Sequence, residues 1–267
     1  WRREMEQEAE IFFFDLAVVY RGIPAVEGTR KIVLAHEEKA GGCLPAGFLE
    51  ILEAGAISPY GLHFFAEAAF NFLTKFFLEE LKEDFVLLLF DHQADLKKGE
   101  GDGLSHRSWL REVMLRVPHC KGILLLGTPE KEKAGINDAL MSLSKEYEEV
   151  PDAGKSYRDP ILNTSLYCFT DMDFQTGRAQ AHIPRLLKLL NLPLYCSMDK
   201  EILSERFTEK EFDEGISFIL KSGMQILGMD IFEEEKAKDE EKNWLFNEKL
   251  ITNYYKNHHS LFLKRKD

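Results

Sequence analysis

Short apolar runs alternate with longer stretches of helical periodicity along most of the chain. Seven runs of five or six residues consist mainly of Val, Ile, Leu, Phe, Tyr or Cys, which is typical of strands covered on both faces. These predicted strands are residues 11–16, 31–35, 85–90, 122–126, 165–170, 194–198 and 225–229. The segments between and after them predict helices at residues 45–54, 64–82, 109–117, 134–149, 183–191, 209–222 and 239–257.

This alternation of strand and helix predicts right-handed βαβ units and one parallel sheet, which is an α/β fold. No linker rich in Pro, Gly or Ser divides the chain, so we expect residues 1–267 to form a single domain. The final predicted helix is amphipathic and should pack on the domain or on another subunit.

The amino-acid composition and net charge limit the classes of binding partner that the protein is expected to have. The chain has 267 residues, a net charge of −12 and 45% hydrophobic residues, which is enough apolar material for a core. The acid excess repels phosphate backbones and anionic lipid, so we expect neither a nucleic-acid nor a membrane partner. No membrane-spanning run or secretion signal is apparent. The widely spaced cysteines indicate reduced thiols and a cytoplasmic location; they are Cys43, Cys120, Cys168 and Cys196.

Acidic residues follow four of the predicted strands. They are Asp91 and Asp95, Asp171 and Asp173, Asp199 and Glu201, and Asp230 and Glu233. The carboxyl ends of parallel strands share one edge of the sheet, where ligands bind in α/β folds. Converging carboxylates repel one another unless a cation offsets the charge, and oxygen ligands suit Mg²⁺, Mn²⁺ or Ca²⁺. Any one cluster alone is more simply a helix cap or a solvated turn.

Several segments resemble one known family in chain order. They are FNFLTKF at 70–76, FDHQAD at 90–95, SHRSWL at 105–110, LPLYCSMDKEIL at 192–203 and FDEG at 212–215. Together they are similar to the arginase/agmatinase/formiminoglutamase (ureohydrolase) family, and most of all to its divergent bacterial arginase-like branch. The resemblance spans roughly residues 60 to 235 and is carried by the segments together rather than by any one of them.

The resemblance implies a three-layer α/β/α sandwich and a binuclear manganese site that hydrolyses C–N bonds of guanidinium-like groups. Position by position, the implied metal ligands are Asn71, Asp91, Gln93, Asp95, Asp199 and Glu201. Three of these depart from the family, which has His at the positions of Asn71 and Gln93 and Asp at that of Glu201. Amides bind Mn²⁺ more weakly than imidazole does, so the site is altered.

Three further candidate site residues have both a functional and a structural interpretation. Strand alternation puts Asp91, Gln93 and Asp95 on one side and His92 on the other, where it would support or pack rather than ligate. His106 is a candidate proton shuttle or a surface-turn histidine. Glu233 is a candidate partner for a guanidinium, or part of a solvated run of charge.

Two more assignments compete with structural roles. His63 follows a short apolar stretch and is better explained as a structural histidine. Asp171 and Asp173 compete with Asp199 and Glu201 for the metal role, and the later pair is favoured because its flanking segment matches the family over a longer run.

Two functions therefore stay open from the sequence. One is a metal-dependent hydrolase of linear amidines that acts on a small molecule, and the other is a non-catalytic family member that binds or scaffolds. The cation would be binuclear Mn²⁺ as in the family, a single Mn²⁺, Mg²⁺ or Ca²⁺, or none. Homo-oligomerisation is equally open. Dinucleotide, nucleoside-triphosphate and GxSxG hydrolase motifs are missing from the sequence.

Overall fold

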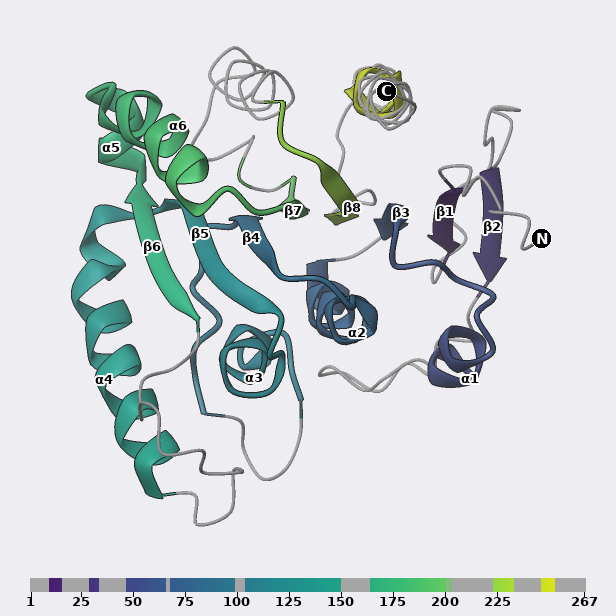
Figure 1. Cartoon of the computed structure of the whole chain (residues 1–267), viewed down its shortest axis with the longest axis horizontal. Helices are drawn as coiled ribbons and strands as arrows, with labels where there is room; N and C mark the ends of the chain where they lie inside the picture. The colour runs from purple at the N-terminus through teal and green to yellow at the C-terminus, as the bar shows by residue number, and fades with distance from the viewer. Residues whose placement is uncertain are drawn as a thin grey trace.

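One parallel sheet of eight strands runs through the described part of the chain in the computed structural model (Figure 1). The structure describes residues 10–15, 29–33, 47–65, 68–98, 104–149, 164–200, 202, 223–232 and 246–252. The strands are β1 (Glu10–Asp15), β2 (Thr29–Val33), β3 (Gly61–Phe65), β4 (Phe85–Phe90), β5 (Cys120–Thr128), β6 (Ser165–Thr170), β7 (Leu194–Asp199) and β8 (Ile226–Phe232). Their order is β2-β1-β3-β8-β7-β4-β5-β6, and every neighbouring pair is parallel.

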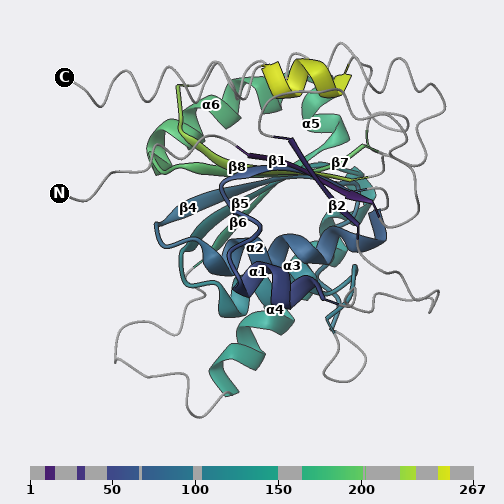
Figure 2. The ribbon, with the colours of Figure 1, turned by 90° about the vertical axis from the view of Figure 1, so that its right-hand side faces the viewer.

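Helices cover both faces of this sheet, as the edge-on view in Figure 2 shows. One face carries α1 (Phe48–Glu53), α2 (Thr74–Glu80), α3 (Trp109–Arg116) and α4 (Lys133–Glu149). The other carries α5 (Asp171–Gln175), α6 (Arg178–Leu190) and the helical residues 246–252. Two 3-10 helices, η1 (Ala68–Leu73) and η2 (Glu130–Glu132), precede α2 and α4. The prediction of a three-layer α/β/α fold is confirmed.

Strand β4 explains why its sequence is apolar without alternation. Leu87 and Leu89 pack into the core beneath α1 to α4, whereas Val86 and Leu88 pack into the core beneath α5 and α6. All six side chains of the strand are buried. A strand covered on both faces gains from apolar residues at every position, which is what the sequence provides.

The main error of the sequence-based prediction lies at residues 64–82, which were expected to form one helix. Phe64 and Phe65 belong instead to β3, an inner strand between β1 and β8. The chain then forms η1 and only afterwards α2. The short strand has a histidine at its centre, so its apolar run was too brief to separate from the phenylalanines that follow.

The remaining predicted elements are largely confirmed. Strand β5 and helix α6 are longer than expected, and α6 contains Pro184 within its span. The final predicted helix is described only at residues 246–252, which are helical, and its Leu250 and Ile251 pack into the core on the α5 and α6 side of the sheet. The predicted helix at 209–222 lies outside the described residues. No helix among the described residues is long and apolar enough to span a lipid bilayer.

Candidate metal centre

The sheet order places the ends of β4 and β7 next to each other. The two strands pair with Phe90 opposite Met198, so Asp91 and Asp199 follow at the same carboxyl edge. Asp91 is 3% exposed and Asp199 is 5% exposed. Two segments that are more than a hundred residues apart thus bring two buried carboxylates together.

His92 completes a group of three metal-ligating side chains. Asp91, His92 and Asp199 each offer one ligand atom, and these atoms all lie within 4.8 Å of one another. His92 Nδ1 lies 3.6 Å from Asp91 Oδ1. Ligand atoms on one octahedral cation lie about 3 Å apart when adjacent and about 4 to 5 Å apart when opposite, for metal–ligand distances of about 2.1 to 2.4 Å. The arrangement therefore fits a single divalent cation.

The expectation that His92 points away from Asp91 is wrong. Strand β4 ends at Phe90, and the chain bends at residues 92 and 93. Side-chain alternation holds only within an extended strand, so it does not govern the residues that follow it. His92 is half-buried, and among the described residues its Nδ1 is a buried atom with no hydrogen-bond partner.

Gln93 forms hydrogen bonds to both Asp91 and His92. Its backbone N–H donates to Asp91 Oδ1 at 2.8 Å, and its side-chain amide lies 3.1 Å from His92 Nε2. The amide atom in this contact is Nε2, which only donates, so His92 Nε2 accepts and the ring proton is on Nδ1, the nitrogen that faces Asp91; a cation bound at Nδ1 would displace this proton. The Gln93 side chain itself is exposed.

Asp95 lies in a separate, buried hydrogen-bonded group. Its Oδ2 accepts a hydrogen bond from Asn71 Nδ2 at 3.0 Å and another from Trp109 Nε1 at 2.9 Å. The backbone of Asp95 is left-handed, with φ of 46°, and Asp95 is not a member of the group formed by Asp91, His92 and Asp199. Burial raises the pKa of Asp95 to about 6, although the hydrogen bonds from Trp109 and Asn71 oppose this.

The turn that carries His106 is held against the Asp95 segment. The backbone carbonyl oxygen of Arg107 accepts a hydrogen bond from the backbone N–H of Lys97 at 3.0 Å. Trp109 follows this turn directly. His106 is half-buried, and its Nδ1 has no hydrogen-bond partner among the described residues. Burial, and the nearby Arg107 cation to a lesser extent, lower the pKa of His106, so the ring is neutral at neutral pH.

Several other candidates have a structural role or fall outside the described residues. Thr170 and Asp173 form the capping box of α5, and Asp171 Oδ1 accepts the backbone N–H groups of Glu130 and Met172, so both acidic residues have structural roles. His63 is fully buried in the sheet. Glu201 and Glu233 lie outside the described residues, so their predicted roles as ligand and guanidinium partner stay predictions.

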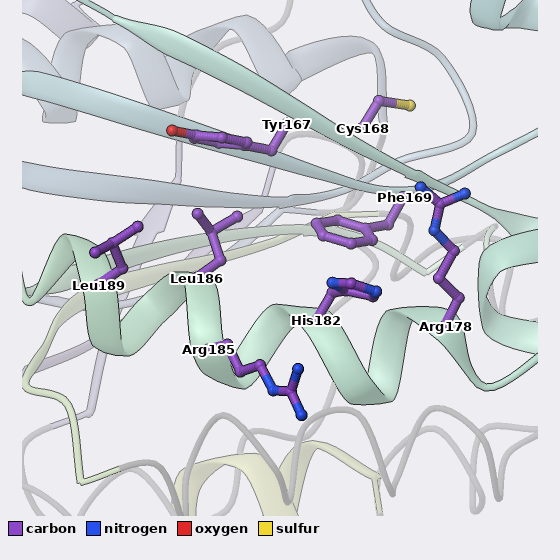
Figure 3. A pocket seen from close by; sticks show the side chains of 8 residues that line it. All are labelled: Tyr167, Cys168, Phe169, Arg178, His182, Arg185, Leu186 and Leu189. Atoms are coloured by element: carbon purple, nitrogen blue, oxygen red, sulfur yellow. The ribbon is translucent and has the colours of Figure 1, made fainter.

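A hollow of about 380 Å³ between β6 and α6 does not include the acidic group (Figure 3). Its lining combines Tyr167 and Phe169 with the cationic Arg178 and Arg185 of α6. Burial raises the pKa of the Cys168 thiol, which also lines it, to about 11. Cys168 is thus protonated at neutral pH and is no nucleophile there.

A buried contact next to Asp199 was not predicted from the sequence. Lys200 Nζ donates to Asn247 Oδ1 at 2.7 Å and lies 5.3 Å from the centre of the Phe246 ring. Lys200 and Asn247 are both buried. The helical residues 246–252 are therefore attached to the strand end that carries Asp199.

The chain has an arginase-like α/β/α fold. The structure is similar to Helicobacter pylori arginase, with a TM-score of 0.57 and 12% identity over 91% of this chain and 99% of that one. It is also similar to formimidoylglutamase from Bacillus subtilis, with a TM-score of 0.56 and 12% identity over 87% of this chain and 81% of that one. Arginase from Bacillus caldovelox gives a TM-score of 0.52 at 11% identity, over 84% and 90% of the two chains.

Sequence comparison alone is less informative. No protein-family model matches the chain. An uncharacterized protein of Thermotoga maritima is 34% identical over 76 residues, which is 28% of this chain and 30% of that protein. The resemblance to the arginase/agmatinase/formiminoglutamase family is thus confirmed as similarity of structure at low sequence identity.

Proposed function

We propose that the protein is a metal-dependent hydrolase of C–N bonds in linear amidines, a class that includes guanidino and formimidoyl compounds. The observation that carries this proposal is the meeting of Asp91, His92 and Asp199 at the carboxyl edge of an arginase-like sheet. A small-molecule substrate and a cytoplasmic location belong to the same proposal.

The residues present fit a divalent cation at this edge. A cation bound there would act as a Lewis acid and would bring the pKa of its bound water toward neutrality. Asp91, Asp199 and His92 Nδ1 would supply the protein ligands, and the backbone N–H of Gln93 orients Asp91. Three protein ligands leave coordination positions for water and substrate.

His106 is the candidate for proton transfer in this proposal. Its lowered pKa leaves a neutral ring that can accept a proton, and its turn is held beside Asp95. Exchange of His106 for Gln should lower kcat much more than it changes KM, and should remove the loss of activity on the acid side of the pH profile.

Assay of a panel of substrates tests the proposal. The purified chain, loaded in turn with Mn²⁺, Mg²⁺ and Ca²⁺, is incubated with guanidino and formimidoyl compounds, and released ammonia and urea are measured. We expect turnover that falls below about one-hundredth in Asp91→Asn and Asp199→Asn, because each removes a charged ligand. Full metal loading without turnover on any compound contradicts the proposal.

That outcome would support the second candidate, a non-catalytic member that keeps the fold and binds or scaffolds. Asn71 and Gln93 favour it, since neither supplies the imidazole expected from the resemblance and Asn71 is hydrogen-bonded to Asp95. The two candidates thus differ in turnover, not in fold.

A further inference from the structure

We propose that the chain binds one divalent cation, on Asp91, His92 and Asp199. A direct hydrogen bond between Asn71 and Asp95 then prevents a second cation from binding beside it. The inference concerns the cation site on which the proposed function rests. It differs from the binuclear arrangement that the family resemblance implies, and it assigns His92, rather than Gln93 or Asn71, as the nitrogen ligand.

The first half of the inference follows from the three ligand atoms. Their mutual distances, within 4.8 Å, suit one coordination sphere. Both carboxylates lie at the strand ends and are more than nine-tenths buried. His92 Nδ1 is buried and has no hydrogen-bond donor or acceptor among the described residues. A buried ring nitrogen without a partner is costly unless a ligand satisfies it.

The second half follows from the group around Asp95. In a binuclear site, Asp95 would offer its oxygens to a cation, but here Oδ2 already accepts two N–H groups, from Asn71 and Trp109. An amide nitrogen carries no lone pair for a metal, and its hydrogens repel a cation. Asn71 Oδ1 is buried and makes no hydrogen bond among the described residues.

Gln93 does not replace the missing ligand. Its side chain is exposed, and its amide contacts the outer nitrogen of His92 rather than the carboxylates. In this proposal the nitrogen ligand is His92, next to Asp91, and not a residue at position 71 or 93. Asn71 and Gln93 instead form hydrogen bonds to the neighbouring side chains.

Stoichiometry of Mn²⁺ binding tests the inference on the full chain. After dialysis against Mn²⁺, we expect one manganese per chain by elemental analysis and the six-line EPR spectrum of an isolated ion. His92→Ala should weaken Mn²⁺ binding at least tenfold, while His119→Ala, which changes an exposed histidine far along the chain, should leave it unchanged. His92→Phe keeps a ring of similar size and replaces the alanine variant if that variant does not fold.

Restoring both imidazoles sharpens the test. Asn71→His combined with Gln93→His should raise the content toward two manganese ions per chain, with an exchange-coupled EPR spectrum. Failure to do so contradicts the role given to Asn71 and Gln93. Two ions or none on the natural chain, or unchanged affinity in both His92 variants, overturns the inference.

These results separate the inference from the proposed function. One bound manganese without turnover refutes the hydrolase and leaves the single-cation site standing. Two bound manganese ions with turnover do the reverse.

Discussion

The protein contains two clusters that pair histidine with aspartate, and they differ in where each lies along its strand. At the carboxyl edge, Asp91 and His92 come just after β4. In the middle of the sheet, His63 of β3 lies opposite Asp230 of β8, and both are fully buried. We call these the edge cluster (Asp91, His92, Asp199) and the sheet cluster (His63, Asp230, Tyr195).

The sheet cluster satisfies its histidine completely. His63 Nδ1 lies 2.7 Å from Asp230 Oδ1, and His63 Nε2 lies 2.8 Å from the carbonyl oxygen of Ser58. The same carboxylate oxygen accepts the Tyr195 hydroxyl at 2.7 Å. The imidazole stacks between Phe12 and Phe77, with ring centres 5.4 Å and 4.2 Å away.

The comparison teaches that residue type alone does not distinguish a structural pair from a ligand set. Both ring nitrogens of His63 are already occupied and water cannot reach them, so the sheet cluster holds neighbouring strands together. His92 Nδ1, at the edge of the sheet, makes no hydrogen bond among the described residues and lies 3.6 Å from Asp91 Oδ1. In the sheet cluster the imidazole is paired at both nitrogens, although Asp230 Oδ2 makes no hydrogen bond among the described residues. Residues beyond a strand end can turn toward a ligand.

The largest expected effect is on the sheet cluster. His63→Ala should lower the free energy of unfolding by about 3 to 5 kcal/mol, because it leaves the Asp230 carboxylate buried without its partner and opens a gap between two phenylalanines. Urea denaturation measures this loss in the free energy of unfolding. His119→Ala is the matched control, since His119 pairs with Asp84 at 3.0 Å on the surface and should cost less than about 1 kcal/mol. Equal losses in the two variants would contradict the comparison.

The next effect concerns pH and the group beside the edge cluster. Burial raises the pKa of Asp95 to about 6, well above the ordinary value for an aspartate, so the folded chain binds this proton more tightly than the unfolded chain does. Stability from this group is therefore fully present below about pH 4 and is lost as the pH rises from about 4 through about 6, by up to about 3 kcal/mol. Asp95→Asn keeps an acceptor oxygen but does not titrate.

Denaturation in the presence of a chelator, from pH 4 to 7, tests this expectation. The stability of the natural chain should fall relative to Asp95→Asn across this range. Parallel curves for the two proteins would show that Asp95 titrates normally in the fold, and would remove the reason to treat its carboxyl as strongly desolvated.

The edge cluster should behave oppositely to the sheet cluster when its carboxylates are removed. Without metal, Asp91→Asn and Asp199→Asn should be as stable as the natural chain or slightly more stable, because two neighbouring carboxylates repel. With Mn²⁺ at about a hundred times its dissociation constant, the natural chain should gain about 2.7 kcal/mol and the variants should gain little. Thermal unfolding with and without Mn²⁺ measures both; a large loss in the chelated variants would assign these aspartates to folding instead.

The two clusters also show which features of the fold and the site could be predicted from the sequence. The apolar run of β4 and the acids that follow it predicted a sheet edge with converging carboxylates, since parallel strands end on one side. That β4 lies beside β7 was not readable from local pattern, because strand order depends on packing over the whole chain. Past Phe90 the backbone no longer repeats, so neither the turn of His92 toward Asp91 nor that of Asp95 toward Trp109 could be predicted.

The smallest expected effect separates support from ligation at the edge cluster. Gln93→Ala keeps the backbone N–H that donates to Asp91, and water can replace the exposed amide at His92 Nε2. We expect stability to change by less than about 0.5 kcal/mol and Mn²⁺ affinity to change by less than about threefold, as measured by calorimetric titration. A loss of tenfold or more would make Gln93 a ligand, and the nitrogen at the edge would then no longer be that of His92 alone.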